Sequence, residues 1–294
     1  QKYSSYSKQN RIKFKKTYNY LCGSGGSRNM IYLSDKYAYK IVPYYKKKPT
    51  DQVRENNNEK EILIYKTLTM ELVLKYKTPH LIGWYDSYKI DIKNILPKKC
   101  PSLSDVYTKP NIYKTHEEEL QCELFRDYKF NKIRDKANVL VMERCIPGGL
   151  ISVFYNLYMD NNPDKYTNII NVLHIVIFQV IFTLAILQDT YHGFVHNDLF
   201  LRNILHTVDL SYELNDYIQY NFKNKKYYLP ASGVYVKIAD FGYSLSKKKF
   251  ISSESLKIKD YITHIPDIEC DKCDIFNFLH DLYDGQGLGI IDRS

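Results

Sequence analysis

The sequence predicts an α+β fold with a strand-rich N-terminal part and a mainly helical C-terminal part. Short segments with strand character, separated by turn residues, lie within residues 13–42, and an apolar run is found at 138–143. The most apolar stretch of helical length, Ile169 to Gln188, lies in the second half. The 294 residues, 44% of them apolar and 26% charged, are enough to bury a large globular core.

A glycine-rich segment comes first. Stretches 13–22 and 28–33 have strand character and flank it. The segment consists of Gly23, Ser24, Gly25 and Gly26. Glycines let backbone N–H groups approach phosphate oxygens because no Cβ stands in the way. A single Gly-x-Gly-Gly is more often an ordinary loop, so it indicates a phosphate site only in combination with motifs further along the chain.

The next predicted strand, 37–42, carries a lysine that can face a nucleotide. Alternation places Ala38 and Lys40 on one face of this strand. A helix is expected to open near residue 58, and Glu59 is the predicted ion-pair partner of Lys40. Glu61 is the alternative, although two residues further on it would face roughly the opposite side of that helix.

Residues 196–203 and 240–242 carry the strongest chemical pattern. The first segment reads His-Asn-Asp-Leu-Phe-Leu-Arg-Asn, which places Asn203 five residues after Asp198. The second segment reads Asp-Phe-Gly and begins with Asp240 after an apolar strand. One carboxylate can orient an attacking hydroxyl, while an amide and another carboxylate hold magnesium ions that bridge nucleotide phosphates.

The order of these motifs resembles the eukaryotic-type protein kinase family, as a divergent member, over about residues 13–282. The resemblance implies a bilobal fold. Its β-rich N-lobe with one main helix would span residues 1–144, and its mainly α-helical C-lobe residues 145–294. It also implies ATP and Mg²⁺ as cofactors and a protein substrate, with Ser/Thr hydroxyls favoured over Tyr.

The resemblance further implies roles for the residues that carry the phosphoryl chemistry. Asp198 would position the substrate hydroxyl, while Asn203 and Asp240 would hold metal. Lys40 would hold the α- and β-phosphates, and Glu59 would orient Lys40.

Other positions are implied to contact the nucleotide base. Met142 would be the gatekeeper, and backbone groups near Glu143 and Cys145 would pair with the adenine edge. Ala38 and Leu205 would lie on the two faces of the adenine ring.

Two further implications concern packing around the catalytic loop. Leu63 would pack toward Phe241 and His196, and Asp274 would hold the backbone of the catalytic loop.

The chain also departs from the usual kinase pattern. Phe200 stands where Ser/Thr kinases usually have a lysine. Arg202 stands where tyrosine kinases have an arginine near the γ-phosphate, so it can supply the missing charge, which leaves the choice between Ser/Thr and Tyr hydroxyls open. Asn197 replaces the usual arginine before the catalytic aspartate, and Arg28 falls on the third glycine of the kinase loop.

Two insertions, at about 90–137 and about 207–233, refine the resemblance. The second is predicted to be a β-hairpin with its turn near Asn224. This region resembles haspin-type kinases and the kinases of large DNA viruses, which also lack the Ala-Pro-Glu element absent between 240 and 274.

Charge and hydropathy limit the other functional classes. The net charge of +9 lies in short lysine runs without a recognised nucleic-acid motif, so direct nucleic-acid binding is not indicated. The apolar stretch 169–188 carries His174 and Gln179, which predicts a buried helix and no membrane span. No secretory signal is seen, so an intracellular location is expected, in the cytoplasm or nucleus, including that of an infected host cell. Nothing in the sequence indicates the oligomeric state.

The six cysteines have no framework spacing, which predicts reduced thiols. Cys270 and Cys273, with His264 and His280 nearby, could bind zinc, but a second Cys-x-x-Cys is missing.

Two alternative functions belong to other classes. Choline and aminoglycoside kinases share a similar aspartate and asparagine loop, but the glycine loop and the segment 138–149 argue against them. A pseudokinase scaffold is disfavoured because all five residues expected to carry out phosphoryl transfer are present. These are Lys40, Glu59, Asp198, Asn203 and Asp240.

Overall fold

The structure is a computed structural model that divides into two compact units. It describes residues 20–21, 30–46, 57–108, 112–113, 116–147, 149–159, 163–213, 216–246 and 270–284. The first unit comprises residues 1–62 and 84–144, and the second comprises 63–83 and 145–294. The boundary after residue 144 agrees with the sequence prediction, but residues 63–83 were expected in the first unit. They belong to the second because the chain segment around Leu81 pairs with Ile238.

The first unit is built on a five-stranded antiparallel sheet in the order β1-β2-β3-β5-β4. The strands are β1 (Tyr20–Leu21), β2 (Met30–Leu33), β3 (Tyr37–Tyr45), β4 (Trp84–Asp91) and β5 (Ile133–Glu143). Strands β3 and β5 are central and consist largely of buried residues. Their β-branched and aromatic side chains, such as Tyr39, Ile41 and Val139, form the core of this unit.

The insertion in the first unit is helical. It holds a short 3₁₀ turn, η3 (Ile92–Asn94), and the helices α2 (Leu103–Thr108) and α3 (His116–Lys129). Leu124 of α3 is buried in the sheet core, and Gln121 Nε2 donates to the Tyr32 hydroxyl at 3.3 Å.

A disulfide joins Cys100 to Cys122 in this insertion, with Cα atoms 5.5 Å apart. The prediction that all the cysteines are reduced is therefore wrong for this pair. Sequence spacing could not reveal it, because the two residues meet only once α3 has folded back on the segment before α2.

Helix α1 (Asn57–Leu68) spans the boundary between the two units and continues into a π-helical turn, η2 (Thr69–Val73). Its buried positions are Glu61, Ile64, Tyr65 and Leu68, which repeat at the spacing of one helix face. Leu63 lies off this face and is 54% exposed.

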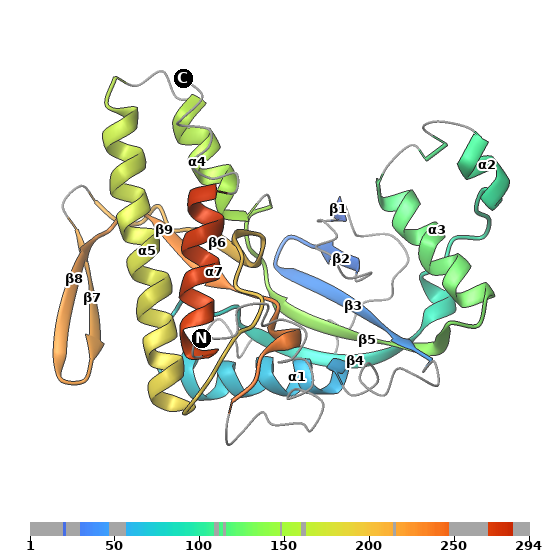
Figure 1. Cartoon of the computed structure of the whole chain (residues 1–294), viewed down its shortest axis with the longest axis horizontal. Coiled ribbons are helices and arrows are strands. Elements are labelled where there is room, and N and C mark those ends of the chain that lie inside the picture. Colours follow the sequence, from blue (N-terminus) through green and yellow to red (C-terminus); the bar gives the residue numbers. More distant parts are fainter. Residues whose placement is uncertain are drawn as a thin grey trace. The chain divides into compact units, whose positions relative to one another are not determined.

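The second unit is mainly helical, with two small sheets (Figure 1). Its helices are α4 (Gly149–Met159), α5 (Lys165–Thr190) and α7 (Cys270–Asp284), with 3₁₀ turns η4 (Leu201–Asn203) and η5 (Phe241–Tyr243). Its strands are β6 (Ile204–Val208), β7 (Tyr217–Phe222), β8 (Lys225–Pro230) and β9 (Val234–Ile238). Strand β6 pairs with β9, and β7 pairs with β8. The α+β prediction is confirmed.

Helix α5 is long and apolar enough to cross a membrane by length and composition, but half of that stretch is buried in the fold. Its Gln179 donates to the Val234 carbonyl at 3.0 Å and accepts from the Val236 amide at 2.9 Å. Both bonds are to the backbone of β9. The helix therefore packs as a core element, in line with the prediction from its polar residues.

The second insertion forms a hairpin at the predicted position. Lys223 and Asn224 form its turn with φ of +47° and +63°, the left-handed conformation that two-residue hairpin turns require. Tyr220 of β7 is buried against Phe178 and Phe182 of α5.

Candidate active site

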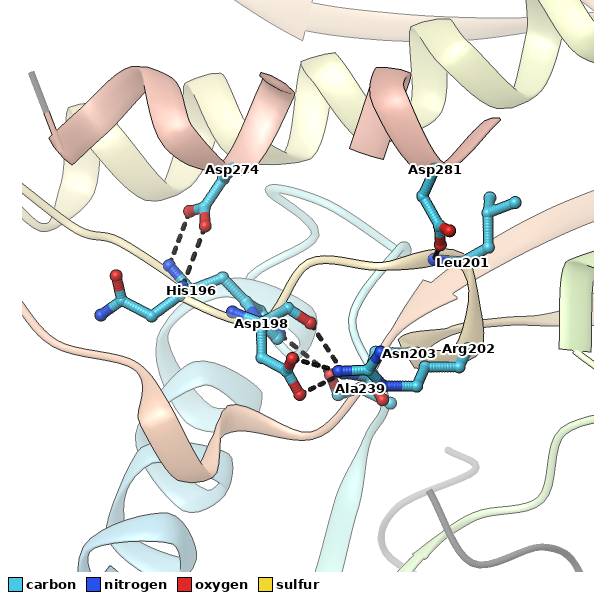
Figure 2. A network of polar contacts seen from close by, with 9 residues as sticks. His196, Asp198, Leu201, Arg202, Asn203, Ala239, Asp274 and Asp281 are labelled. Atoms are coloured by element: carbon cyan, nitrogen blue, oxygen red, sulfur yellow. Dashed lines mark hydrogen bonds and ion pairs between the residues drawn. The ribbon is translucent and has the colours of Figure 1, made fainter. Parts of the chain in front are cut away.

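The catalytic loop places Asp198 and Asn203 in direct contact (Figure 2). Asn203 Nδ2 donates to the Asp198 carboxylate at 2.8 Å and to the Asp198 carbonyl at 2.7 Å. The turn between them is tight, because the Phe200 amide donates to the Asp198 carbonyl and the Asn203 amide to the Phe200 carbonyl. The five-residue spacing seen in the sequence is thus the length of one closed turn.

Asp240 lies two residues after the end of strand β9 and beside the turn from Asp198 to Asn203. The Ala239 amide donates to the Asn203 carbonyl at 2.9 Å, so the residue before Asp240 is bonded to the other predicted metal ligand. Asp240 itself has φ +63°, the left-handed conformation that Asp and Asn tolerate better than most residues. Its amide donates to the Tyr65 hydroxyl at 2.8 Å.

The electrostatics of this cluster suit a divalent cation. Burial raises the pKa of Asp198, and the negative charge of Asp240 raises it further, while Arg202 and Asn203 act in the opposite direction. A cation beside Asp198 would favour the charged carboxylate and so oppose the effects of burial and of the Asp240 charge. Carboxylate and amide oxygens are also the ligands that Mg²⁺ prefers.

No group of three or more His, Cys, Asp or Glu side chains within the described ranges could hold a metal ion. The predicted metal set is of another composition, one amide and one carboxylate. Of the candidate zinc ligands, His264 and the side chains of Cys270 and Cys273 lie outside the described residues.

Arg202 forms an ion pair with Asp198 and lies over the ring of Phe200, with 4.4 Å between the guanidinium carbon and the ring centroid. The guanidinium therefore contacts both a carboxylate and an aromatic face. Phe200, the residue that replaces the usual lysine, thus supports the arginine two positions later.

His196 has a structural role. Its Nε2 donates to the Ala239 carbonyl at 2.9 Å, and its Nδ1 accepts from the Asp198 amide at 3.3 Å, which defines a neutral ring. Burial lowers the pKa of His196 to about 4, in agreement with that state. The ring centroid lies 5.0 Å from that of Phe241.

Asp274 of α7 holds the start of the catalytic loop. Its carboxylate accepts from the His196 amide at 2.6 Å and from the Asn197 amide at 2.9 Å. Burial raises the pKa of Asp274 to about 6, and these two hydrogen bonds oppose that shift.

The lysine of β3 pairs with Glu61, not with Glu59. Lys40 Nζ lies 2.6 Å from Glu61 Oε1, and both side chains are almost wholly buried, with exposures of 5% and 6%. Glu59 is 55% exposed and bonds instead to Lys89 at 3.1 Å and to the Tyr44 hydroxyl. The predicted partner is therefore wrong, and the alternative is correct.

The error has a physical reason. Leu63 was expected to pack toward Phe241, and it lies four residues after Glu59, so both were taken to lie on the buried face of α1. A second stripe was available: Ile64, Tyr65 and Leu68 lie three, four and seven residues after Glu61.

The same shift of two residues corrects the prediction for Leu63. Tyr65, not Leu63, packs against Phe241, with ring centroids 5.1 Å apart in an edge-to-face arrangement. Its hydroxyl also accepts the hydrogen bond from the Asp240 amide. Tyr65 was missed because it lies four residues after Glu61, whereas Leu63 lies four residues after Glu59, the residue predicted to face inward.

The predicted adenine contacts are distributed over both units. In the first, Ala38 of β3 pairs with Met142 of β5, and both side chains are buried, as is Glu143. In the second, Cys145 is buried, and Leu205 lies in β6. The glycine loop, Gly23 to Gly26, lies outside the described residues.

The chain after Asp240 is joined to the catalytic loop. Val195 and Leu245 exchange both backbone hydrogen bonds at 2.9 Å. Ser244 Oγ donates to the His196 carbonyl, and Asn197 Nδ2 donates to the Tyr243 carbonyl at 3.1 Å. Asn197 thus makes a neutral bond at the position where the kinase pattern has a charged arginine.

Comparison with known proteins decides the family. No family model matches the sequence. A protein of Acanthamoeba polyphaga mimivirus described as a "putative serine/threonine-protein kinase" is 36% identical over 279 residues, covering 89% of this chain and 69% of that protein. The chain belongs to the serine/threonine-protein kinase family. The resemblance to kinases of large DNA viruses is thereby confirmed.

A second mimivirus kinase with the same description is 30% identical over 188 residues, which cover 63% of this chain and about a third (36%) of that protein. Among solved structures, the bifunctional kinase-methyltransferase WbdD matches 82% of this chain and 35% of its own, with 13% identity and a TM-score of 0.34. This structural likeness is weak.

Proposed function

We propose that this kinase uses ATP and Mg²⁺ to phosphorylate Ser or Thr hydroxyls of a protein substrate. The observation that carries the proposal is the bonding of Asn203 to Asp198 beside Asp240, since these are the groups that phosphoryl transfer needs. When bound, MgATP supplies the phosphoryl group and the positive charge that offsets its developing negative charge.

Asp198 would accept the hydrogen bond of the substrate hydroxyl and orient it for attack. Its raised pKa supports this role, because a base works best when its pKa approaches the operating pH. Arg202 would keep the carboxylate charged and present a cation toward the transferred phosphate. Asn203 and Asp240 would hold the metal.

In the first unit, Lys40 would hold the α- and β-phosphates, and Glu61 would fix its orientation. The 2.6 Å ion pair supports this, because a buried ammonium this close to a carboxylate has little freedom to move. We assign the remaining nucleotide contacts as the family resemblance implies. They are Gly23, Ser24, Gly25, Gly26, Ala38, Met142, Glu143, Cys145 and Leu205.

The hydroxyl class is tested by a phosphotransfer assay. Purified protein with radiolabelled ATP would be offered protein mixtures, Ser/Thr peptides, Tyr peptides, choline and aminoglycosides. We expect label on protein, recovered as phosphoserine or phosphothreonine after acid hydrolysis. Label only on choline or an aminoglycoside would contradict the proposal, and so would phosphotyrosine alone. Absence of transfer to any acceptor would support a pseudokinase.

We further propose that the protein acts inside cells that such viruses infect, because the relatives are mimivirus proteins. The Cys100–Cys122 disulfide is a reason to test this, since cytosolic disulfides are rare. Fractionation of infected cells, with thiol labelling of the recovered protein, would locate it. Recovery only from the medium would contradict the intracellular proposal. The haspin-like refinement and the absence of direct nucleic-acid binding stay predictions.

A further inference from the structure

A second carboxylate of α7 contacts the catalytic loop. Asp281 accepts a hydrogen bond from the Leu201 amide at 2.6 Å. Asp281 lies seven positions after Asp274, which is about two helical turns, so both residues lie on the same face of α7. Figure 2 shows the two side chains pointing from α7 onto the loop, one at each end of it.

Asp281 contacts the turn that contains Asn203, because Leu201 is part of the same turn. Leu201 begins the 3₁₀ turn η4, whose last residue is Asn203, and it lies inside the turn that Asn203 closes on Asp198. The first N–H groups of such a turn have no partner within it. The Leu201 side chain is buried, with 2% exposure. Asp281 supplies the partner with a full negative charge, which makes a short, strong hydrogen bond.

We propose that Asp281 is a positioning residue of the metal site: by fixing the start of η4, it sets the direction in which Asn203 presents its amide. This rests on the proposed function, because it takes Asn203 as a metal ligand. Asp274 fixes the loop before Asp198, and Asp281 fixes it after Asp198. Helix α7 thus holds the loop at two points that lie about 10 Å apart along the helix axis.

The mechanism predicts a specific defect. Without Asp281, η4 can shift while Asp274 still holds His196 and Asn197, so the loop stays attached but the Asn203 amide loses its fixed direction. Metal-independent contacts to a nucleotide would remain. Metal-dependent affinity would fall, because residues that orient metal ligands typically contribute roughly 10- to 100-fold to metal affinity.

The test is calorimetric titration of the full chain with ADP, once in excess Mg²⁺ and once in EDTA. The ratio of the Kd in EDTA to the Kd in Mg²⁺ isolates the contribution of the metal to ADP affinity, whereas a merely structural loss would raise both Kd values alike. We expect Asp281→Ala to reduce this ratio by roughly tenfold. Asp281→Asn, which keeps an acceptor oxygen but loses the charge, should lie between Asp281→Ala and the unaltered chain.

Leu279→Ala is the matched control. It changes a residue two positions before Asp281 on the same helix to the same residue, and the Leu279 side chain is 40% exposed. It should leave the ratio unchanged. If Asp281→Ala does not fold, Asp281→Asn carries the test, with a smaller expected change in the same direction.

An unchanged ratio in folded Asp281→Ala, beside a clear metal effect in the unaltered chain, would overturn this inference alone. Absence of any metal effect on ADP binding in the unaltered chain would overturn the proposed function as well. The two failures are therefore distinguishable.

Discussion

Two ion pairs of this kinase differ in burial, and we expect them to differ in their contributions to stability and activity. Lys40 and Glu61 are almost wholly buried, with side-chain exposures of 5% and 6%, whereas Arg202 is 52% exposed and its partner Asp198 is 16% exposed. A buried pair cannot lose one member cheaply, because the other charge is left without solvent. A pair with one exposed member contributes less to stability, since water screens the exposed charge. The first pair should therefore matter for both fold and activity, and the second for chemistry alone.

The largest effect should come from breaking the buried pair. Lys40→Met and Glu61→Gln should each lower kcat/KM by roughly 100-fold or more, the order found when one transition-state hydrogen-bond donor is removed or misplaced. Glu61→Gln should also lower the free energy of unfolding by about 3 kcal/mol, because the buried Lys40 ammonium loses the charge of the carboxylate 2.6 Å away. Steady-state kinetics and urea unfolding measure the two effects. Normal kinetics in Glu61→Gln would refute the assignment.

A third carboxylate extends the comparison, because Asp274 is buried against backbone amides and not against a cation. Burial raises its folded-state pKa to about 6, above the ordinary value of 3.8. A raised pKa favours the protonated form, so the stabilisation is fully present below about pH 4 and is lost as the pH rises through 6. Stability should fall by on the order of 3 kcal/mol across that window.

Asp274→Asn should remove this slope, because asparagine does not titrate. It should also lower stability, because the two amides donate to different oxygens of Asp274 and the asparagine NH₂ group cannot accept a hydrogen bond. Thermal unfolding from pH 4 to 7 tests this. Asp189→Asn, at a half-exposed site in the same unit, is the control and should keep the slope. A slope that persists in Asp274→Asn would assign it to another group.

The exposed pair should show the opposite behaviour. Arg202→Met should change the free energy of unfolding by less than about 1 kcal/mol. Because Arg202 holds down the pKa of Asp198, its removal should raise that pKa, and the acidic limb of the pH–rate profile should move to higher pH. An unshifted limb would show that Arg202 does not act on Asp198.

The smallest effect is expected at Glu59, which is 55% exposed and pairs with an exposed lysine. Glu59→Gln should leave kcat/KM within about twofold and stability within about 1 kcal/mol. It is the matched control for Glu61→Gln, two residues away on the same helix. A larger kinetic loss in Glu59→Gln than in Glu61→Gln would restore the original prediction.

The elements that could be predicted from the sequence are those whose spacing is local. The turn from Asp198 to Asn203 and the hairpin turn at Asn224 are set by residues a few positions apart, and the structure has both where they were expected. Contacts between distant segments were harder to predict from the sequence. The choice between Glu59 and Glu61 depended on which stripe of α1 is buried, and two overlapping stripes were apolar enough.

Two other contacts carried no readable signal. Cys100 and Cys122 are 22 residues apart, and only the fold of α3 brings them together. The bond from Leu201 to Asp281 spans 80 residues and involves a backbone amide, which no sequence pattern marks. Such contacts depend on tertiary packing, which brings together segments that are remote in the chain.

The most direct test of the kinase account is the rate of γ-phosphate transfer by Asp240→Asn in saturating Mg²⁺. Asp240 lies beside the Asp198–Asn203 turn, and its charge already acts on Asp198. Asparagine keeps the shape and removes the charge that would hold the metal, so kcat should fall by roughly 100-fold or more while the protein stays folded. A loss of that size, with Asp189→Asn unaffected, is the predicted result. Full activity of Asp240→Asn would contradict the account.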